Sequence, residues 1–347
     1  MMKAVAVLEK GSVGIVELPR PEYGEYECLV RNRACGFCSS TDMKIIHNDL
    51  ADMDVRYPTI LGHEGAGEIV AAGGKVKNFR VGDRVTCARG VCPRDTGYSF
   101  TWGEMAEYTI VHDVYAMAEA GIDLSKATPG KTLTTYPVRK IPAELSYEDA
   151  VMILSFEENY SALLNFGVKA GMEILLYGDG TIAMGLTLLA KKIIGAGFTA
   201  CVGHHDDKLA LISAYAGADC VINAHTQNME EALSGRRFDL VIDAVGSIAV
   251  VKQGLRLLKN GGKMSIYGVP KKEHATLNLF DMPNNTMLHM LTWPEDEHSV
   301  HGEVVDLIRA GQLVPKDFYT DVLPFTQIQQ AIDLIQTRKA RKVILTF

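Results

Sequence analysis

The chain has 347 residues, of which 47% are hydrophobic and 22% charged, and its formal net charge is −7. This length exceeds what one small core needs, so we expect two domains. The negative charge argues against nucleic acid as a partner, and no apolar run is long enough to cross a membrane. The start of the chain lacks the apolar core of a signal peptide. Seven cysteines, an odd number, suit a reducing compartment, so we expect a cytoplasmic protein.

The first 115 residues contain short apolar runs separated by Gly, Pro and Asp, which predicts a β-rich domain. The expected strands are 2–7, 27–30, 67–72, 84–87 and 108–111. From about Tyr147 the pattern changes to alternating helical and strand-like segments. Such alternation is typical of βαβ units with a parallel sheet.

Continuous apolar runs in this second part fit buried parallel strands at 173–177, 198–202, 220–222, 240–242 and 263–267, with an edge strand at 286–292. Helices are expected at 182–194 and 208–215. The segment after Gly302 has helix–strand–helix–strand character, and its last strand, around 342–345, is expected to rejoin the first domain. The sequence therefore predicts an α/β protein: a doubly wound parallel sheet at 153–294, and a β-rich domain formed by 1–152 and 295–347.

Two glycine-flanked motifs, Gly36-Phe37-Cys38 and Gly62-His63-Glu64, lie 25 residues apart. A thiolate and an imidazole are ligands that zinc prefers, and zinc held by three protein groups keeps a fourth position open for chemistry. Cys38 and His63 are therefore candidate metal ligands. The alternative is that both are ordinary buried residues of the core.

The segment 155–162 contains two adjacent acids that could supply the third ligand. Glu158 is the first choice and Glu157 the second, because neighbouring carboxylates face different sides of a helix and only one can reach the metal. The alternative is that both are acids of the first turn of a helix, favoured by its dipole. Glu64 either supports His63 or alternates as a fourth ligand, unless it is a surface acid.

Ser40 follows Cys38 at an offset from which a hydroxyl can pass the proton of a substrate hydroxyl onward, with His47 as a further step. The alternative is that this serine only starts a helix. Asp42 or Thr41 could orient the imidazole of His63. We expect Ser40, Glu64 and Asp42 to take part in catalysis.

A glycine-rich turn follows the strand expected at 173–177. Gly178 and Gly180 permit a tight turn, and Thr181, Ile182 and Ala183 open the next helix. The N-terminus of such a helix binds a pyrophosphate, so this strand–turn–helix predicts a dinucleotide site.

The next strand ends at Gly203, where an NAD enzyme usually carries an acid that binds the ribose 2′-hydroxyl. A glycine there, followed by His204 and Lys208, favours NADP(H). The alternative is that Asp206 or Asp207 reaches the ribose instead.

Two further strand ends belong to the same crevice. Val245 and Gly268 follow the strands expected at 240–242 and 263–267. Because the carboxyl ends of parallel strands line the cofactor crevice, we expect their backbones to contact the nicotinamide half.

Together these motifs resemble the zinc-dependent medium-chain dehydrogenase/reductase family, which includes alcohol, polyol and threonine dehydrogenases. The resemblance spans essentially the whole chain and rests on segments 36–38, 62–67, 81–85, 103–108, 178–183 and 341–343. It implies a GroES-like catalytic domain, a Rossmann domain, one catalytic zinc, a dimer or tetramer, and Lys342 as a cofactor contact.

The sequence departs from the family pattern at two places. Glu158-Asn159 resembles the Glu-Pro segment that supplies a third ligand, without its proline. Of the cysteines that bind a structural zinc in many relatives, only Cys87 and Cys92 are present, and two thiols cannot complete a tetrahedral site. We therefore expect no structural zinc.

The resemblance implies reversible oxidation of a secondary alcohol or polyol, a small molecule, to a ketone with NAD or NADP. Two other functions remain open. One is a zinc-free NADPH-dependent quinone or enone reductase of the same superfamily, and the other is a non-enzymatic nucleotide-binding protein.

Overall fold

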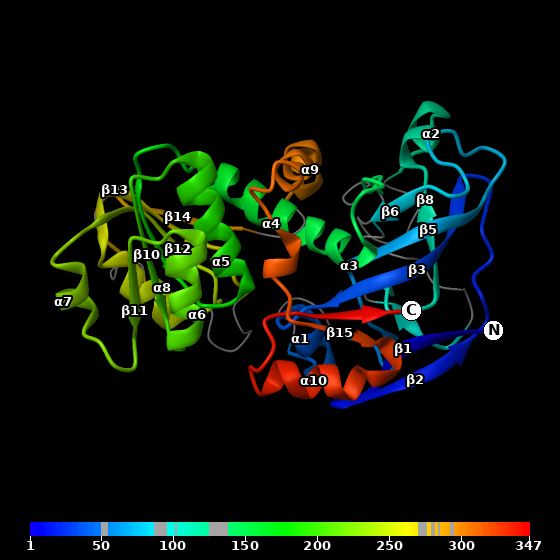
Figure 1. Cartoon of the computed structure of the whole chain (residues 1–347), viewed down its shortest axis with the longest axis horizontal. Helices are drawn as coiled ribbons and strands as arrows, with labels where there is room; N and C mark the ends of the chain where they lie inside the picture. Colours follow the sequence, from blue (N-terminus) through cyan, green and yellow to red (C-terminus); the bar gives the residue numbers. More distant parts are fainter. Residues whose placement is uncertain are drawn as a thin grey trace. The chain divides into compact units, whose positions relative to one another are not determined.

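The computed structural model describes residues 1–49, 55–86, 96–100, 103–124, 138–269, 276–278, 282–283, 285–291 and 295–347. The chain forms two compact units (Figure 1). Unit 1 contains Met1–Glu157 and His298–Phe347, and unit 2 contains Glu158–Glu297. Within the described ranges, every helix is too short or too polar to pass through a membrane.

Unit 1 is built on two sheets. The smaller one has the order β2 (Ser12–Leu18), β1 (Met2–Glu9), β4 (Thr59–Ile60), β7 (Ser99–Phe100). The larger one has the order β15 (Asp321–Pro324), β16 (Val343–Thr346), β3 (Glu27–Phe37), β5 (Gly65–Ala72), β6 (Arg84–Thr86), and β8 (Tyr108–His112) also pairs with β3. These strands confirm the β-rich, GroES-like character expected of the first part of the chain.

Strands β2, β4 and β7 of unit 1 were not predicted, because the sequence pattern of each is weak. Strand β2 has a mostly half-buried or exposed pattern, so it shows no continuous apolar run. Strands β4 and β7 have two residues each, which is below the length at which periodicity can be recognised.

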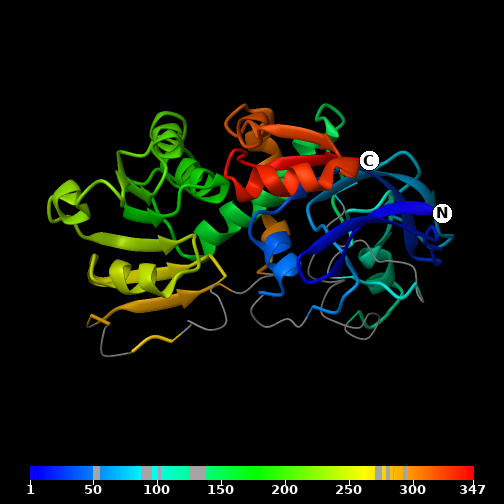
Figure 2. The ribbon, with the colours of Figure 1, turned by 90° about the horizontal axis from the view of Figure 1, so that it is seen from below.

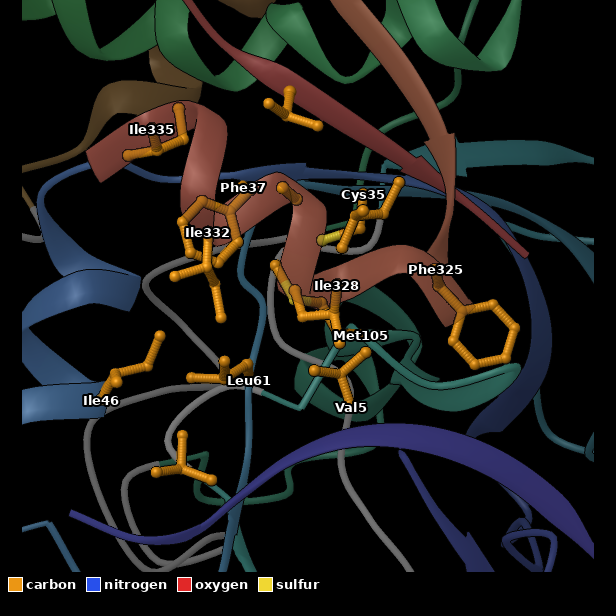
Figure 3. Close-up of a cluster of buried hydrophobic side chains, with 14 of the residues drawn as sticks. Val5, Cys35, Phe37, Ile46, Leu61, Met105, Phe325, Ile328, Ile332 and Ile335 are labelled. Atoms are coloured by element: carbon orange, nitrogen blue, oxygen red, sulfur yellow. The ribbon is translucent and has the colours of Figure 1, made fainter. Parts of the chain in front are cut away.

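The last strand returns to the first part of the chain, as expected. Strand β16 pairs antiparallel with β3, with Val343 opposite Phe37. Helix α10 (Ile328–Gln336) precedes it, and Figure 3 shows Ile328, Ile332 and Ile335 directed into the cluster that also contains Phe37. The C-terminal segment is thus part of the core of unit 1. The other helices of this unit are α1 (Thr41–His47), α2 (Val114–Glu119), α3 (Tyr147–Ala150) and α9 (His301–Arg309).

Unit 2 is a parallel sheet of six strands. The order is β11 (Cys220–Asn223), β10 (Phe198–Gly203), β9 (Glu173–Tyr177), β12 (Phe238–Asp243), β13 (Leu258–Ile266), β14 (Met287–Met290). Read in chain order this is 3-2-1-4-5-6, the arrangement of the dinucleotide-binding Rossmann fold. All six strands expected from the sequence are present, and Figure 2 shows β14 as the orange strand at one edge of the sheet.

The helices of unit 2 also match the expectation closely. Helix α5 (Thr181–Leu188) continues with π geometry over Leu189–Ile194, and α6 (Asp206–Leu211) does so over Ile212–Ala216. The remaining helices are α7 (Met229–Leu233) and α8 (Ile248–Leu255). Helix α4 (Met152–Asn165) spans the sequence boundary between the two units.

Candidate metal centre and dinucleotide site

Pairing of two strands brings the distant cysteine and histidine motifs together. Strands β3 and β5 are antiparallel, with Cys35 opposite Gly65 (Figure 1). Cys38 follows β3 and His63 precedes β5, so both motifs lie at the same end of this strand pair. Cys38 and His63 therefore lie close together in unit 1, although 25 residues separate them in the sequence.

Gly36 and Gly62 lie where neighbouring atoms leave no room for a side chain. A Cβ atom on Gly36 would lie 2.8 Å from Cε of Lys342 and 2.9 Å from Cγ1 of Val151. Gly62 has a φ of +98°, and a Cβ there would lie 2.6 Å from the backbone nitrogen of Met105. A side chain at position 36 would push aside the side chains of Lys342 and Val151, and one at position 62 would overlap the backbone of Met105.

The candidate ligand atoms converge. One atom each of Cys38, His63 and Glu64 lie within 4.8 Å of one another, and no other such group of three His, Cys, Asp or Glu residues occurs in the described ranges. Nε2 of His63 lies 3.9 Å from Oε1 of Glu64. The third member of this cluster is Glu64, which the sequence offered only as a supporting or alternating ligand.

Asp42 contacts both Cys38 and His63. Its carboxylate is fully buried, accepts a hydrogen bond from the backbone nitrogen of Cys38 at 2.8 Å, and lies 3.5 Å from Nδ1 of His63. The backbone nitrogen of Thr41 donates to Sγ of Cys38 at 3.3 Å. A carboxylate on one imidazole nitrogen fixes the ring so that the other nitrogen can serve as a ligand.

Electrostatics favour the ionised thiol. Burial alone would raise the pKa of Cys38, but its hydrogen bond with His63 and the charge of that ring bring the pKa below its ordinary value. Burial lowers the pKa of His63, while Asp42 and Cys38 raise it more, so the pKa lies well above its usual range. A thiolate is the form of cysteine that binds metal.

These donors fit zinc. A thiolate sulfur, an imidazole nitrogen and a carboxylate oxygen are the ligand types of catalytic zinc sites, which use three protein ligands. A carboxylate next to the second nitrogen of the ligand histidine, as Asp42 is here, is common in such sites.

Lys342 lies next to this cluster. Its ammonium forms an ion pair with Glu64 and donates to Oγ of Ser155 at 3.1 Å, and both charged side chains are buried. The sequence suggested Lys342 as a cofactor contact, a role that stays a prediction. No pattern near Lys342 in the sequence indicates its pairing with Glu64, because the two residues meet through the pairing of both β16 and β5 with β3.

A pocket of unit 1 opens beside the cluster, and its lining includes His63, Glu64, Leu154 and Glu157. The carboxylate of Glu157 is buried and lies 2.5 Å from Nδ1 of His301. Helix α4 begins at Met152, so the two adjacent acids lie inside the helix rather than in its first turn. Glu158 begins unit 2, and its part as a metal ligand stays a prediction.

Ser40 precedes α1 and is exposed. Its hydroxyl accepts a hydrogen bond from Nζ of Lys44 at 3.1 Å. Its role in proton transfer stays a prediction. Cys87 and Cys92, on which the expectation of no structural zinc rests, lie outside the described residues.

In unit 2 the glycine-rich turn connects β9 to α5. Gly178 has a φ of +129°, which favours glycine, and Gly180 directly precedes the first residue of the helix, Thr181. The helix N-terminus that the sequence assigned to a pyrophosphate, with Ile182 and Ala183 in its first turn, is therefore in place.

At the end of β10, where the sequence favours NADP(H), an acid lies next to Gly203. The side chain of Asp179, from the glycine-rich turn, covers Gly203 and contacts the residues after it. The ring of His204 packs against that of His225, with centroids 4.3 Å apart. Lys208 lies in α6 and is partly exposed.

The ends of β12 and β13 pack closely. The buried carboxylate of Asp243 accepts hydrogen bonds from the backbone nitrogens of Val245 and Gly246 at 2.8 and 3.0 Å. A Cβ atom on Gly268 would lie 2.6 Å from the carbonyl carbon of Val245. The two turns assigned to the nicotinamide half are thus neighbours at the carboxyl edge of the sheet.

Two family models match the chain. Residues 24–122 match an alcohol dehydrogenase GroES-like domain, and residues 181–307 match a zinc-binding dehydrogenase. A sorbitol dehydrogenase from Bacillus subtilis (strain 168) is 27% identical over 343 residues, covering 96% of this chain and 93% of the relative.

Solved structures share the fold over the whole chain. A proposed zinc-binding dehydrogenase from Sinorhizobium meliloti 1021, bound to NADP, has a TM-score of 0.78 at 23% identity, covering 100% of this chain and 99% of the other. A short chain alcohol dehydrogenase from Escherichia coli CFT073, complexed with NADH, has a TM-score of 0.79 at 22% identity with the same coverage.

Proposed function

Because the chain belongs to the zinc-dependent medium-chain dehydrogenase/reductase family, we propose that it oxidises a secondary alcohol or polyol reversibly. It is an NAD(P)-dependent enzyme that acts on CH–OH groups. A bound nicotinamide would accept the hydride of the carbinol carbon while the hydroxyl loses its proton, so the overall products would be a ketone, the reduced dinucleotide and one proton.

The convergence of Cys38, His63 and Glu64, with Asp42 behind the imidazole, supports this proposal most strongly. We propose that Cys38, His63 and one carboxylate, Glu158 or Glu64, hold one catalytic zinc. A zinc ion bound there would supply a Lewis acid that lowers the pKa of a substrate hydroxyl.

The residues of the chain have separate tasks in this proposal. Cys38 and His63 bind the metal, and Asp42 orients the imidazole through Nδ1. Ser40 passes the proton that the substrate hydroxyl loses onward, with His47 as the next acceptor. Lys342 balances the charge of Glu64, which would otherwise be a costly buried anion.

In unit 2, we propose that the N-terminus of α5 binds the pyrophosphate and that Val245 and Gly268 contact the nicotinamide half. The sequence preference for NADP(H) over NAD(H) has the support of Gly203 and Lys208. The contacts of Asp179 with the end of β10 oppose it. The cytoplasmic location and the absence of a structural zinc stay predictions.

The first test is the zinc content of the purified protein by elemental analysis. We expect about one zinc per chain, lost in Cys38→Ser and retained in Cys220→Ser, a matched change in unit 2. Glu158→Ala and Glu64→Ala distinguish the two candidates for the third ligand. The variant that loses zinc marks the residue that binds it. Zinc-free wild-type protein would contradict the proposal and favour the quinone or enone reductase.

Activity is the second test. The zinc-loaded protein is mixed with secondary alcohols and polyols and with each dinucleotide, and the absorbance of the reduced nicotinamide is followed. Zinc and dinucleotide binding without turnover of any alcohol would favour the non-enzymatic nucleotide-binding protein.

A further inference from the structure

The carboxylate of Asp179 takes the place of a side chain that β10 lacks. Asp179 belongs to the turn between β9 and α5, and it lies over Gly203, the last residue of β10. A Cβ atom built on Gly203 would be 2.6 Å from Cβ and 2.7 Å from Oδ2 of Asp179. No larger residue fits at position 203 while Asp179 keeps this position.

Three contacts hold this carboxylate. Oδ2 accepts hydrogen bonds from the backbone nitrogens of His204 and His205 at 2.7 and 3.0 Å, and it lies 2.8 Å from Nδ1 of His205. Its side chain is 14% exposed. Burial alone would raise the pKa of Asp179, but the hydrogen bonds from both histidines lower it below its ordinary value, so the group remains ionised.

The contacts define an anion site at the end of β10. Two backbone N–H groups and an imidazole converge there, and such donors would suit the 2′-phosphate of NADP. In this chain Asp179 already occupies them. A 2′-phosphate would have to displace the carboxylate or lie beside it, and like charges placed together oppose binding strongly.

We propose that Asp179 is the acid that recognises the adenosine ribose, and that it makes the enzyme select NAD(H) over NADP(H). In NAD enzymes of this fold an acid near the end of the second strand binds the ribose 2′-hydroxyl. Here the acid comes from the glycine-rich turn instead. This inference rests on the proposed dinucleotide site of unit 2, but not on zinc or on the substrate.

The proposal gives Gly203 a different meaning. A glycine at this position suggested room for a phosphate, whereas the structure shows that its missing side chain makes room for Asp179. The acid lies on the glycine-rich turn and the glycine lies at the end of β10. A variant with aspartate at 203 and glycine at 179 is therefore expected to show the same preference.

The experiment measures dissociation constants of NADH and NADPH with the full-length, zinc-loaded protein by titration of nicotinamide fluorescence. We expect the wild type to bind NADH more tightly. Asp179→Asn removes the charge at constant shape and is expected to shift the ratio of the two constants towards NADPH by about tenfold or more. The double variant Asp179→Gly/Gly203→Asp is expected to prefer NADH again.

Glu230→Gln is the matched control, because Glu230 is an exposed acid in α7 of the same unit and has no assigned part in dinucleotide binding. It should leave the ratio unchanged. Tighter binding of NADPH by the wild type overturns the proposal even where a variant fails to fold, and so does an unchanged ratio in a folded Asp179→Asn. If the protein binds neither dinucleotide, both the proposed function and this inference are wrong. If it lacks zinc but still prefers NADH, only the zinc part of the proposed function is wrong.

Discussion

The carboxylate of Asp42 lies 3.5 Å from Nδ1 of His63, and the same carboxylate accepts a hydrogen bond from the backbone nitrogen of Cys38. One buried acid therefore fixes both the imidazole and the backbone of the cysteine. The two candidate metal ligands, Cys38 and His63, are therefore positioned by one buried acid that lies outside the cluster of candidate ligand atoms.

We expect Asp42→Asn to weaken zinc binding by about 10- to 100-fold, because an amide holds the imidazole less firmly and leaves it less basic. Competition with a chromogenic chelator measures this change. Asp49→Asn, an exposed acid just beyond α1, is the control and should bind zinc like the wild type. Unchanged affinity in Asp42→Asn would contradict the orienting role.

Gly36→Ala is expected to destabilise the protein by roughly 1–3 kcal/mol and to lower its zinc content, because the added Cβ overlaps the stem of Lys342 and the carboxylate of Glu64. Gly74→Ala, where nothing lies within 4 Å of the added atom, should change stability by less than about 0.5 kcal/mol. Chemical denaturation measures both. Equal stability of the two variants would show that the Glu64–Lys342 pair tolerates the extra methyl.

The stability of the protein should fall as the pH rises from 5 to 8, in part through Glu295. Burial raises the pKa of this carboxyl to about 7, with help from the charges of Glu297 and Asp296 and against a hydrogen bond from Ser161. Between its ordinary value of 4.5 and about 7, the folded state keeps a proton that the unfolded state has lost. Stability therefore decreases with pH across this window and is lost no further above it.

Scanning calorimetry at several pH values tests this dependence on Glu295. Glu295→Gln cannot ionise, so its melting temperature should fall less between pH 5 and pH 8 than that of the wild type. Glu303→Gln, an exposed acid of α9, should follow the wild type. Parallel curves for wild type and Glu295→Gln would rule out this carboxyl as the source.

The chain is expected to form homodimers or homotetramers. Strand β14 lies at one edge of the sheet of unit 2 (Figure 2). Its residues Met287, Leu288 and Met290 are each exposed by 42% or more. An apolar edge strand is a template for pairing with a second chain. Light scattering should give a mass above that of one chain, which Leu288→Lys lowers and Val81→Lys, in unit 1, does not. A monomeric wild type would contradict this expectation.

The sequence by itself determined the parts of this protein that depend on residues close together in the chain. Continuous apolar runs predicted all six strands of unit 2, because an apolar run is recognised from its own residues without knowledge of the strand that it pairs with. The glycine turn before Thr181 and the Gly-flanked Cys38 and His63 were identified for the same reason, since each motif carries its own backbone requirement.

Only the tertiary structure decided which side chains meet. Strand pairing placed Lys342 against Glu64, and a turn placed Asp179 over Gly203, although nothing near any of these residues signals its partner. The inference from Gly203 alone pointed to a phosphate, because a sequence shows a missing side chain but not the neighbour that fills its space. Contacts between distant segments are set by the packing of the whole domain, and in this chain they determine the charge around the candidate metal ligands and around the end of β10.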